Sequence, residues 1–270
     1  AQTRLDDPGK GHNVYLAEQN CEGSRDLAYS LSAIELALAD AGLEFDRADN
    51  KIGMIQAYEA PGVERTATKL FQLFSTPPTG GPPPVYDLLA PAFYNMQAFL
   101  YVHVVAKAFG LRGFCTSVHN ACSSGAFAIE TAAQQIRSGQ SDVMIVVGGE
   151  CFETAVRLEW FRRLNLYAQS PDSMRPFSPD TTGFYVGEGA AAMVLESAES
   201  AAKRGATPYA RYLGGAFAHQ AWKQTIPDVR AARLKDVILD ACSHTGTDLT
   251  AIDLIVQLDR QTDGSRVVGE

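Results

Sequence analysis

Cys122 lies in the segment HNACSSGAFA (119–128), between a short β-branched run and a stretch of small residues typical of a helix start. A thiol in the first turn of a helix is close to unpaired N–H groups and to the positive end of the helix dipole, which favours the thiolate. The small residues Ser123, Ser124 and Gly125 leave room for a substrate carbonyl to reach the sulfur and the nearby backbone donors. The pattern is typical of a nucleophile at a strand-to-helix turn, with sulfur in place of a hydroxyl. The alternative is a small, buried, hydrophobic cysteine.

The segments around this turn alternate between helical and strand-like patterns. Helices are predicted over 27–42, 94–109 and 123–139, and strands over 51–58, 114–120 and 142–150. Each helix pattern stops at a glycine, and the last strand is apolar on both faces, as in a central parallel strand. This order of elements is that of β-α-β units, so the predicted fold class is α/β. The connection over 75–87 is dense in Pro and Gly and is predicted to be irregular.

A second segment, RPFSPDTTGFYVGEGAAAMVLES (175–197), combines a Pro/Asp/Gly-rich turn with a Gly-x-x-x-Gly-Glu-Gly stretch and a predicted buried strand. Together with the A-C-S-S-G of 121–125, it resembles the β-ketoacyl synthases, the elongating condensing enzymes of fatty acid and polyketide synthesis. The pattern R-P-F-D-x-x-R-x-G-F-x-x-G-E-G-A of that family is matched here by Arg175, Pro176, Phe177, Asp180, Gly183, Phe184, Gly187, Glu188, Gly189 and Ala190. Gly148-Gly149 and FGLRG (109–113) add to the resemblance.

The resemblance implies the thiolase-like fold, a layered α/β/α/β/α arrangement of two related halves. Residues 1–205 are predicted to form the first half, which carries the nucleophile turn. Residues 206–270 are predicted to begin a second, incomplete half within one continuous core.

A repeat within the sequence agrees with two related halves. The helix-loop-strand pattern IELALADAG…KIGMI recurs at an offset of 200 residues as LKDVILDAC…AIDLI. The identical positions are Asp40 and Asp240, Ala41 and Ala241, Ile52 and Ile252, and Ile55 and Ile255. Chance similarity between amphipathic helices followed by apolar strands is the alternative explanation.

The same resemblance assigns roles and partners. Cys122 would be the nucleophile that attacks an acyl thioester delivered by an acyl carrier protein or coenzyme A, and its backbone N–H would help to hold the oxyanion. Glu188 is interpreted as a turn and packing residue, because nothing indicates that it carries a proton. Nucleophile strands of related enzymes pair across a dimer interface, so residues 114–119 are the expected contact in a homodimer or in a heterodimer with a ketosynthase-like chain.

The histidines of the family's decarboxylating machinery are missing from this sequence. The family carries an H-G-T-x-T-P motif after a strand such as IDLIV, and a second histidine with a lysine further on. Here Asp259 falls at the position of the first histidine, and Glu270 at the acidic residue that closes the motif. An ionised carboxylate cannot donate a hydrogen bond to a developing enolate, so Asp259 is a poor substitute. His119, three positions before the cysteine, is predicted to be structural, and the other histidines have no motif context: His12, His103, His219 and His244.

Composition excludes several classes of function. A net charge of −8 with scattered Lys and Arg gives no basic surface for nucleic acid or an anionic membrane, and the longest apolar run, VMIVV, is too short to cross a bilayer. The five cysteines are an odd number without a C-x-x-C pair, which indicates neither a disulfide framework nor a structural metal site. We therefore expect a cytoplasmic protein with no cofactor and no metal.

Three hypotheses follow for function. In the first, the chain is a condensing enzyme that loads an acyl group on Cys122 and extends it with a malonyl-type unit. In the second, it is a noncatalytic partner resembling a chain-length factor; the intact A-C-S-S-G opposes this hypothesis and the missing histidines favour it. In the third, it is an acyltransferase or thioester hydrolase that forms an acyl-Cys122 without decarboxylation.

Overall fold

The computed structural model describes most of the chain between residues 12 and 252. The described residues are 12–21, 23–58, 62, 66–68, 70–71, 75, 96–152, 155–168, 170–175, 178–180, 182–222, 228 and 230–252. Their helices span Asn13–Glu18 (α2), Arg25–Asp40 (α3), Ala98–Phe109 (α6), Ser124–Arg137 (α7), Ala155–Arg163 (α8), Ala198–Lys203 (α9) and Ala232–Thr245 (α10). Short 3-10 turns lie at Ala121–Ser123 (η1), Pro171–Ser173 (η2) and Leu249–Ala251 (η3).

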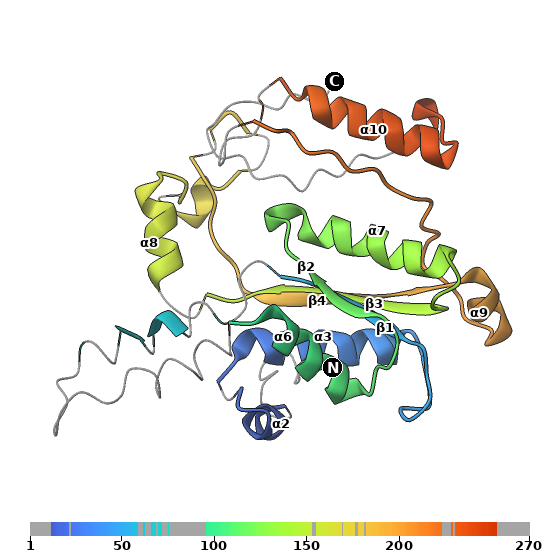
Figure 1. Ribbon diagram of the computed structural model, residues 1–270. Coiled ribbons are helices and arrows are strands. Elements are labelled where there is room, and N and C mark those ends of the chain that lie inside the picture. The colour runs from blue at the N-terminus through green and yellow to red at the C-terminus, as the bar shows by residue number, and fades with distance from the viewer. Residues whose placement is uncertain are drawn as a thin grey trace. The chain divides into compact units, whose positions relative to one another are not determined.

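The strands of the described residues form one mixed sheet in the order β2-β1-β3-β4 (Figure 1). They span Gly53–Ala57 (β1), Cys115–Val118 (β2), Val143–Glu150 (β3) and Gly189–Glu196 (β4). β1 is parallel to both β2 and β3, whereas β4 is antiparallel to β3. The carboxyl ends of β1, β2 and β3 therefore meet at one edge, where β4 begins. This edge is called the carboxyl edge of the sheet below.

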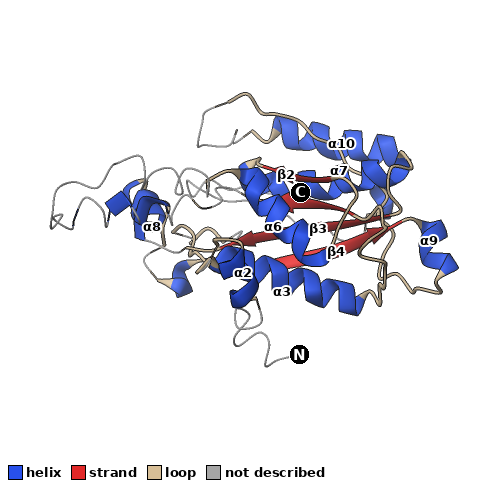
Figure 2. Ribbon diagram, turned by 60° about the horizontal axis from the view of Figure 1, so that its bottom comes forward, coloured by secondary structure: helices blue, strands red, loops and turns tan. Residues whose placement is uncertain are grey.

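The sheet is covered on both faces, and β1 is buried along its whole length. Met54 of β1 packs with Ile145 of β3 and with the apolar sides of α3 and α6. Ile55 and Ala57 point the other way and pack with Ala128 of α7 and its neighbours. Figure 1 shows α7 on one face and α3 and α6 on the other, and Figure 2 brings the α3 and α6 face forward. The strand period of two thus separates two cores, one for each face.

The elements predicted from periodicity are confirmed, with shifted ends. α3 ends before Gly42, whose φ of 56° is left-handed, and α6 ends at Gly110, with a φ of 70°. α6 begins at Ala98 instead of near residue 94, because Gln97 is extended. The predicted connection over 75–87 lies outside the described residues apart from Ser75.

The FGLRG turn places the nucleophile strand against the rest of the sheet. A Cβ added at Gly113 would lie 2.3 Å from the carbonyl oxygen of Lys51, so only glycine permits this approach. The Gly113 N–H donates to the Ile52 carbonyl oxygen at 2.9 Å. Asn50 Nδ2 donates to the Gly110 carbonyl oxygen at 2.9 Å. The motif therefore fixes where β2 starts beside β1.

β4 differs from its prediction as a buried strand. Its residues are half-buried or exposed, and Met193 is 46% exposed. The reason is its position, because β4 is the last strand in the order of the described sheet. Half of its apolar pattern faces α3, where Ala192 and Val194 join the core.

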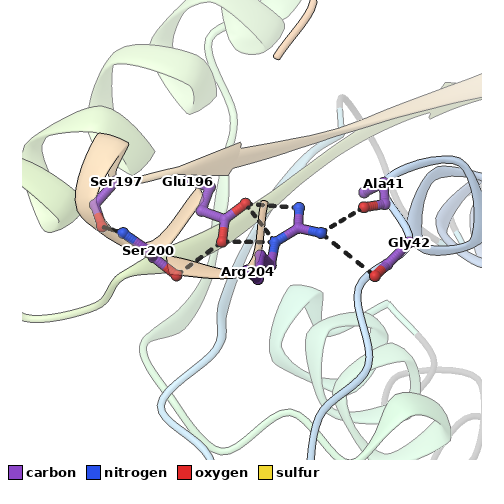
Figure 3. A network of polar contacts seen from close by, with 6 residues as sticks. All are labelled: Ala41, Gly42, Glu196, Ser197, Ser200 and Arg204. Carbon is purple, nitrogen blue, oxygen red and sulfur yellow. Dashed lines mark hydrogen bonds and ion pairs between the residues drawn. The ribbon is translucent and has the colours of Figure 1, made fainter. Parts of the chain in front are cut away.

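An ion pair at the opposite edge of the sheet joins the ends of β4 and α3 (Figure 3). Arg204, just after α9, donates to both carboxylate oxygens of Glu196, with Nη2 2.7 Å from Oε2. Its Nη1 donates to the carbonyl oxygens of Ala41 at 2.8 Å and Gly42 at 3.3 Å. Arg204 thus satisfies carbonyl groups at the end of α3 that the helix itself leaves unpaired.

By its contacts the chain divides into two compact units, residues 1–155 with 187–209 and residues 156–186 with 210–270. The first unit holds the sheet and the helices that cover it. In the second unit, Phe161 of α8 is buried and its ring meets that of Phe184 edge-on, with centroids 4.9 Å apart. The predicted division into halves at residues 205 and 206 stays a prediction.

The predicted repeat is found in part. A helix, α10, occurs in the second copy, and it ends at Gly246 with a left-handed φ of 67°. At the offset of 200, Asp40 is the last residue of α3 whereas Asp240 lies within α10, so the two helices end at different points of the repeat. The strand predicted to follow α10 lies outside the described residues apart from its first position, Ile252.

We expect Arg204→Met to lower the free energy of unfolding by about 1–2 kcal/mol at neutral pH, because it leaves the Glu196 carboxylate, 9% exposed, without its main donor. The hydrogen bond from Arg204 is the main cause that lowers the pKa of Glu196 below its ordinary value of 4.5. A lowered pKa contributes stability above that ordinary value and loses it as pH falls through the folded value. In urea unfolding, the difference between wild type and variant should therefore shrink below about pH 4.

The matched control is Lys203→Met, which removes an exposed cation one position away. It should cost less than about 0.5 kcal/mol at any pH. If the free energy of unfolding of Arg204→Met stays below that of wild type by a constant amount down to about pH 3, the assigned role of the ion pair is contradicted.

Candidate functional site

Cys122 lies at the carboxyl edge of the sheet, in the turn that joins β2 to α7. β2 ends at Val118, and Cys122 is the middle residue of the 3-10 turn η1. α7 begins two residues later, at Ser124, so the cysteine precedes the helix instead of lying in its first turn. Its side chain is exposed, which excludes the alternative of a cysteine sealed in a core.

Ser124 holds this turn together. Its side chain is buried, and Oγ accepts from the Asn120 N–H at 2.8 Å while donating to the Ala121 carbonyl oxygen at 2.7 Å. Ala121 has a φ of 49°, a left-handed conformation that costs a residue with a Cβ about 1 kcal/mol. The strain falls on the residue directly before Cys122, where the hydrogen bonds of Ser124 compensate for it.

Cys122 is the only exposed cysteine of the five. Cys115, on the same strand-turn segment, is half-buried, and burial raises the pKa of its thiol. Cys21 and Cys151 are buried. Among the described residues the backbone N–H of Cys122 meets no acceptor, so it is available to a ligand oxygen. An accessible thiol and a free donor thus belong to the same residue.

His119 directly follows β2 and contacts a residue of that strand. Its Nε2 lies 2.9 Å from Ser117 Oγ, two positions back along the chain. The contact supports the structural role predicted for this histidine.

Glu188 of the Gly-Glu-Gly stretch connects three elements. One carboxylate oxygen pairs with the guanidinium of Arg25, the first residue of α3. The other accepts from the Phe152 N–H, just after β3, at 3.0 Å. Because Glu188 directly precedes β4, it joins the beginnings of α3 and β4 to the end of β3. These contacts agree with its interpretation as a packing residue.

A buried hydrogen-bond network at the start of α3 was missed by the sequence analysis. Asp26 accepts from Ser24 Oγ and from the Leu27 N–H, the latter at 2.8 Å, with one carboxylate oxygen. Its other oxygen accepts from the Tyr58 hydroxyl, just after β1. Burial, and then the neighbouring Asp26 carboxylate, raise the pKa of Tyr58, so the phenol keeps the proton that it donates. Polar residues before an apolar helix are the signal that could have indicated a helix start here.

Gln56 carries a buried side-chain amide that meets no hydrogen-bond partner among the described residues. It lies on β1 beside Ser117 of β2, and neither its amide nitrogen nor its amide oxygen is paired in the part of the chain that the structure describes. An unpaired buried amide costs about 1–3 kcal/mol. The chain thus keeps a destabilising group two residues before Tyr58.

Several predicted site residues lie outside the described residues, among them Asp259 and Glu270. So do Pro176 and Phe177 of the Arg-Pro-Phe motif. The described residues hold no group of three or more His, Cys, Asp or Glu side chains placed to bind a metal ion. None of their helices is both long and apolar enough to cross a bilayer.

Residues 24–201 match the family described as "Beta-ketoacyl synthase, N-terminal domain". The matched range holds the sheet, the Cys122 turn and the Gly-Glu-Gly stretch. The chain belongs to the β-ketoacyl synthase family.

Two curated relatives illustrate the likeness. Nodulation protein E of Rhizobium leguminosarum bv. trifolii is 40% identical over 134 residues, which are 49% of this chain and 33% of that protein. The chloroplastic 3-oxoacyl-[acyl-carrier-protein] synthase II of Arabidopsis thaliana is 30% identical over 246 residues, 85% of this chain and 42% of that protein. The chain thus spans less than half of the length of each of these two relatives.

Solved structures show the same fold. A β-ketoacyl synthase from Burkholderia phymatum STM815 matches with a TM-score of 0.72 at 28% identity, over 84% of this chain and 55% of that one. The ishigamide ketosynthase/chain length factor matches with a TM-score of 0.71 at 28% identity, over 85% of this chain and 55% of that one. The predicted thiolase-like α/β fold is confirmed.

We expect Ser124→Ala to lower the free energy of unfolding by about 1–2 kcal/mol, because the Asn120 N–H and the Ala121 carbonyl lose their partner beside a strained residue. The neighbouring Ser123→Ala removes a single exposed hydrogen bond to the Asn120 carbonyl oxygen and should cost less than about 0.5 kcal/mol. Urea unfolding of both variants measures the difference. Equal costs would contradict the role assigned to Ser124.

Proposed function

We propose that this chain carries the acyl-loading step of a β-ketoacyl synthase. Cys122 takes an acyl group from an acyl carrier protein or coenzyme A thioester, and the whole protein extends that group with a malonyl-type unit. The observation that carries the proposal is the exposed thiol of Cys122, in a turn held by Ser124 at the carboxyl edge of the sheet, with a backbone N–H that meets no acceptor among the described residues.

The loading step is a thioester exchange. The thiolate of Cys122 attacks the thioester carbonyl carbon, and the resulting oxyanion is held by backbone donors that include the free Cys122 N–H. The carbon–sulfur bond to the carrier then breaks, and the carrier sulfur leaves as a thiolate that takes up the proton released from Cys122. The exchange needs no oxidant, reductant or metal ion.

The extension step needs groups that polarise the extender thioester. In enzymes that this sequence resembles, two histidines polarise the extender thioester. The sequence has Asp259 at the position of the first and no H-G-T-x-T-P motif. This observation favours a second candidate, an acyltransferase or thioester hydrolase that stops at acyl-Cys122. A noncatalytic chain-length-factor-like partner remains the third hypothesis, which the exposed Cys122 opposes.

We infer that the partners are an acyl carrier protein and a second ketosynthase-like chain. The name of the Arabidopsis thaliana relative includes an acyl carrier protein, and the ishigamide protein is a ketosynthase/chain length factor. β2 supports a pairing role, because it is the first strand in the order of the described sheet and its residues are half-buried. A cytoplasmic location stays a prediction.

Acyl loading is tested by intact mass spectrometry after incubation with an acyl carrier protein thioester. We expect a single acyl adduct on wild type and on Cys242→Ala, and none on Cys122→Ser, because only the thiol of Cys122 is both exposed and beside a free donor. Malonyl carrier is then added to the loaded protein. Carbon dioxide release with a β-keto product supports the condensing enzyme.

The other outcomes separate the alternatives. An adduct that persists or hydrolyses without a β-keto product supports the acyltransferase or hydrolase. An adduct that survives Cys122→Ser, or none on wild type, would contradict the loading role.

Pairing through β2 is tested by sedimentation velocity. Phe114, directly before β2, is 45% exposed, and Phe114→Arg should convert a dimer into a monomer by placing a charge at the contact. Val14→Arg changes a residue of α2 that is 71% exposed, and it should leave the dimer intact. A wild-type monomer at micromolar concentration, or equal behaviour of both variants, would contradict the expected interface.

A further inference from the structure

The first turn of α3 is connected to the carboxyl edge of the sheet at several points. Tyr58 follows β1, and its hydroxyl donates to the buried carboxylate of Asp26. The backbone N–H of Tyr58 donates to the carbonyl oxygen of Val118, the last residue of β2, at 3.3 Å. Asp26 therefore reaches the strand that leads into the Cys122 turn through one intervening residue.

The neighbouring residue of α3 reaches the other two strands. Arg25 pairs with Glu188, which directly precedes β4. Glu188 in turn accepts from the Phe152 N–H, two residues after β3, at 3.0 Å. Two consecutive helix residues thus act on the ends of β1, β2 and β3 and on the beginning of β4.

We propose that Arg25 and Asp26 are positioning residues for the Cys122 turn. They act from the α3 face of the sheet, while the thiol is carried by the segment that enters α7 on the other face. By holding the strand ends together, they keep the end of β2 fixed relative to β1 and β3. Their effect on acyl transfer rests on the proposed function, because that reaction needs the sulfur and the oxyanion donor in one geometry.

The connection from Asp26 to Tyr58 and the connection from Arg25 to Glu188 differ in burial, so they differ in expected strength. Asp26 is 5% exposed, and removing a donor leaves part of a buried carboxylate unpaired. The side chain of Arg25 is 54% exposed, and an ion pair with such access to water is weak. The hydrogen bond from Tyr58 to Asp26 therefore contributes most to holding the turn in position, and the ion pair between Arg25 and Glu188 contributes less.

The test compares Tyr58→Phe and Arg25→Met with Arg204→Met. The control breaks the ion pair between Arg204 and Glu196 of β4, and with it the hydrogen bonds from Arg204 to the carbonyl groups at the end of α3, at the opposite end of the strands (Figure 3). Acyl loading of Cys122 is measured at a temperature at which every variant is folded. We expect kcat to fall roughly tenfold for Tyr58→Phe and about threefold for Arg25→Met with KM unchanged, and to stay at the wild-type value for Arg204→Met.

A second readout does not depend on acyl chemistry. The alkylation rate of Cys122 by iodoacetamide in the folded protein should fall in the same order, because the turn no longer holds the sulfur at the amino end of α7. Arg25→Lys, which keeps the charge, should recover part of the rate lost in Arg25→Met. A wild type that accepts no acyl group would defeat the proposed function alone, and alkylation would still decide the positioning role.

The proposal is overturned if Tyr58→Phe and Arg25→Met lose stability but keep the loading and alkylation rates of Arg204→Met. Such a result would mean that the contacts of α3 stabilise the fold without acting on the turn. Tyr58→Phe keeps the aromatic ring, whose centroid lies 5.6 Å from that of Tyr101, so this variant retains the packing needed to fold.

Discussion

The burial of β1 on both faces is the constraint on which the rest of the structure depends. Each of its five residues is buried, with Met54 directed toward α3 and α6 and Ile55 directed toward α7. Because parallel strands on both sides share its register, the ends of β2 and β3 come to the same edge. At that edge β2 ends and the Cys122 turn begins. The packing of the two cores fixes the strands, and it therefore decides where the thiol lies.

Local chemistry then shapes the turn within that frame. Ser124 offers a hydroxyl that accepts and donates within four residues, and this permits Ala121 to adopt a left-handed conformation that its Cβ disfavours. The result is a cysteine that faces solvent although it follows a half-buried strand. The neighbouring Cys115 has the opposite environment, because its position on the strand takes it into the sheet's interior. One segment therefore holds an exposed thiol at Cys122 and, at Cys115, a half-buried thiol whose pKa is raised by burial.

α3 works as a brace with a polar connection at each end. At its first turn, Arg25 and Asp26 reach the carboxyl edge of the sheet, and at its last turn the carbonyl groups of Ala41 and Gly42 accept from Arg204. The apolar side between these ends packs on the strands. Hydrogen bonds depend on distance and angle, so the contacts of Arg25 and Asp26 fix the first turn of α3 against the strand ends, while Arg204 pairs the carbonyl groups at the far end of the helix.

The sequence by itself determined the α/β class, the approximate bounds of β1, β3, α3 and α7, and the turn that carries Cys122, because helix and strand periods and glycine stops are local properties. The prediction from sequence that β4 is buried was wrong, because the same apolar pattern occurs in the outermost strand of a sheet and in a central strand. Only the tertiary structure decided that Arg25 meets Glu188, 163 positions away, and that Asp26 meets Tyr58. Such contacts depend on sheet register and helix placement, which follow from the packing of the whole core and leave no periodic signal in either segment.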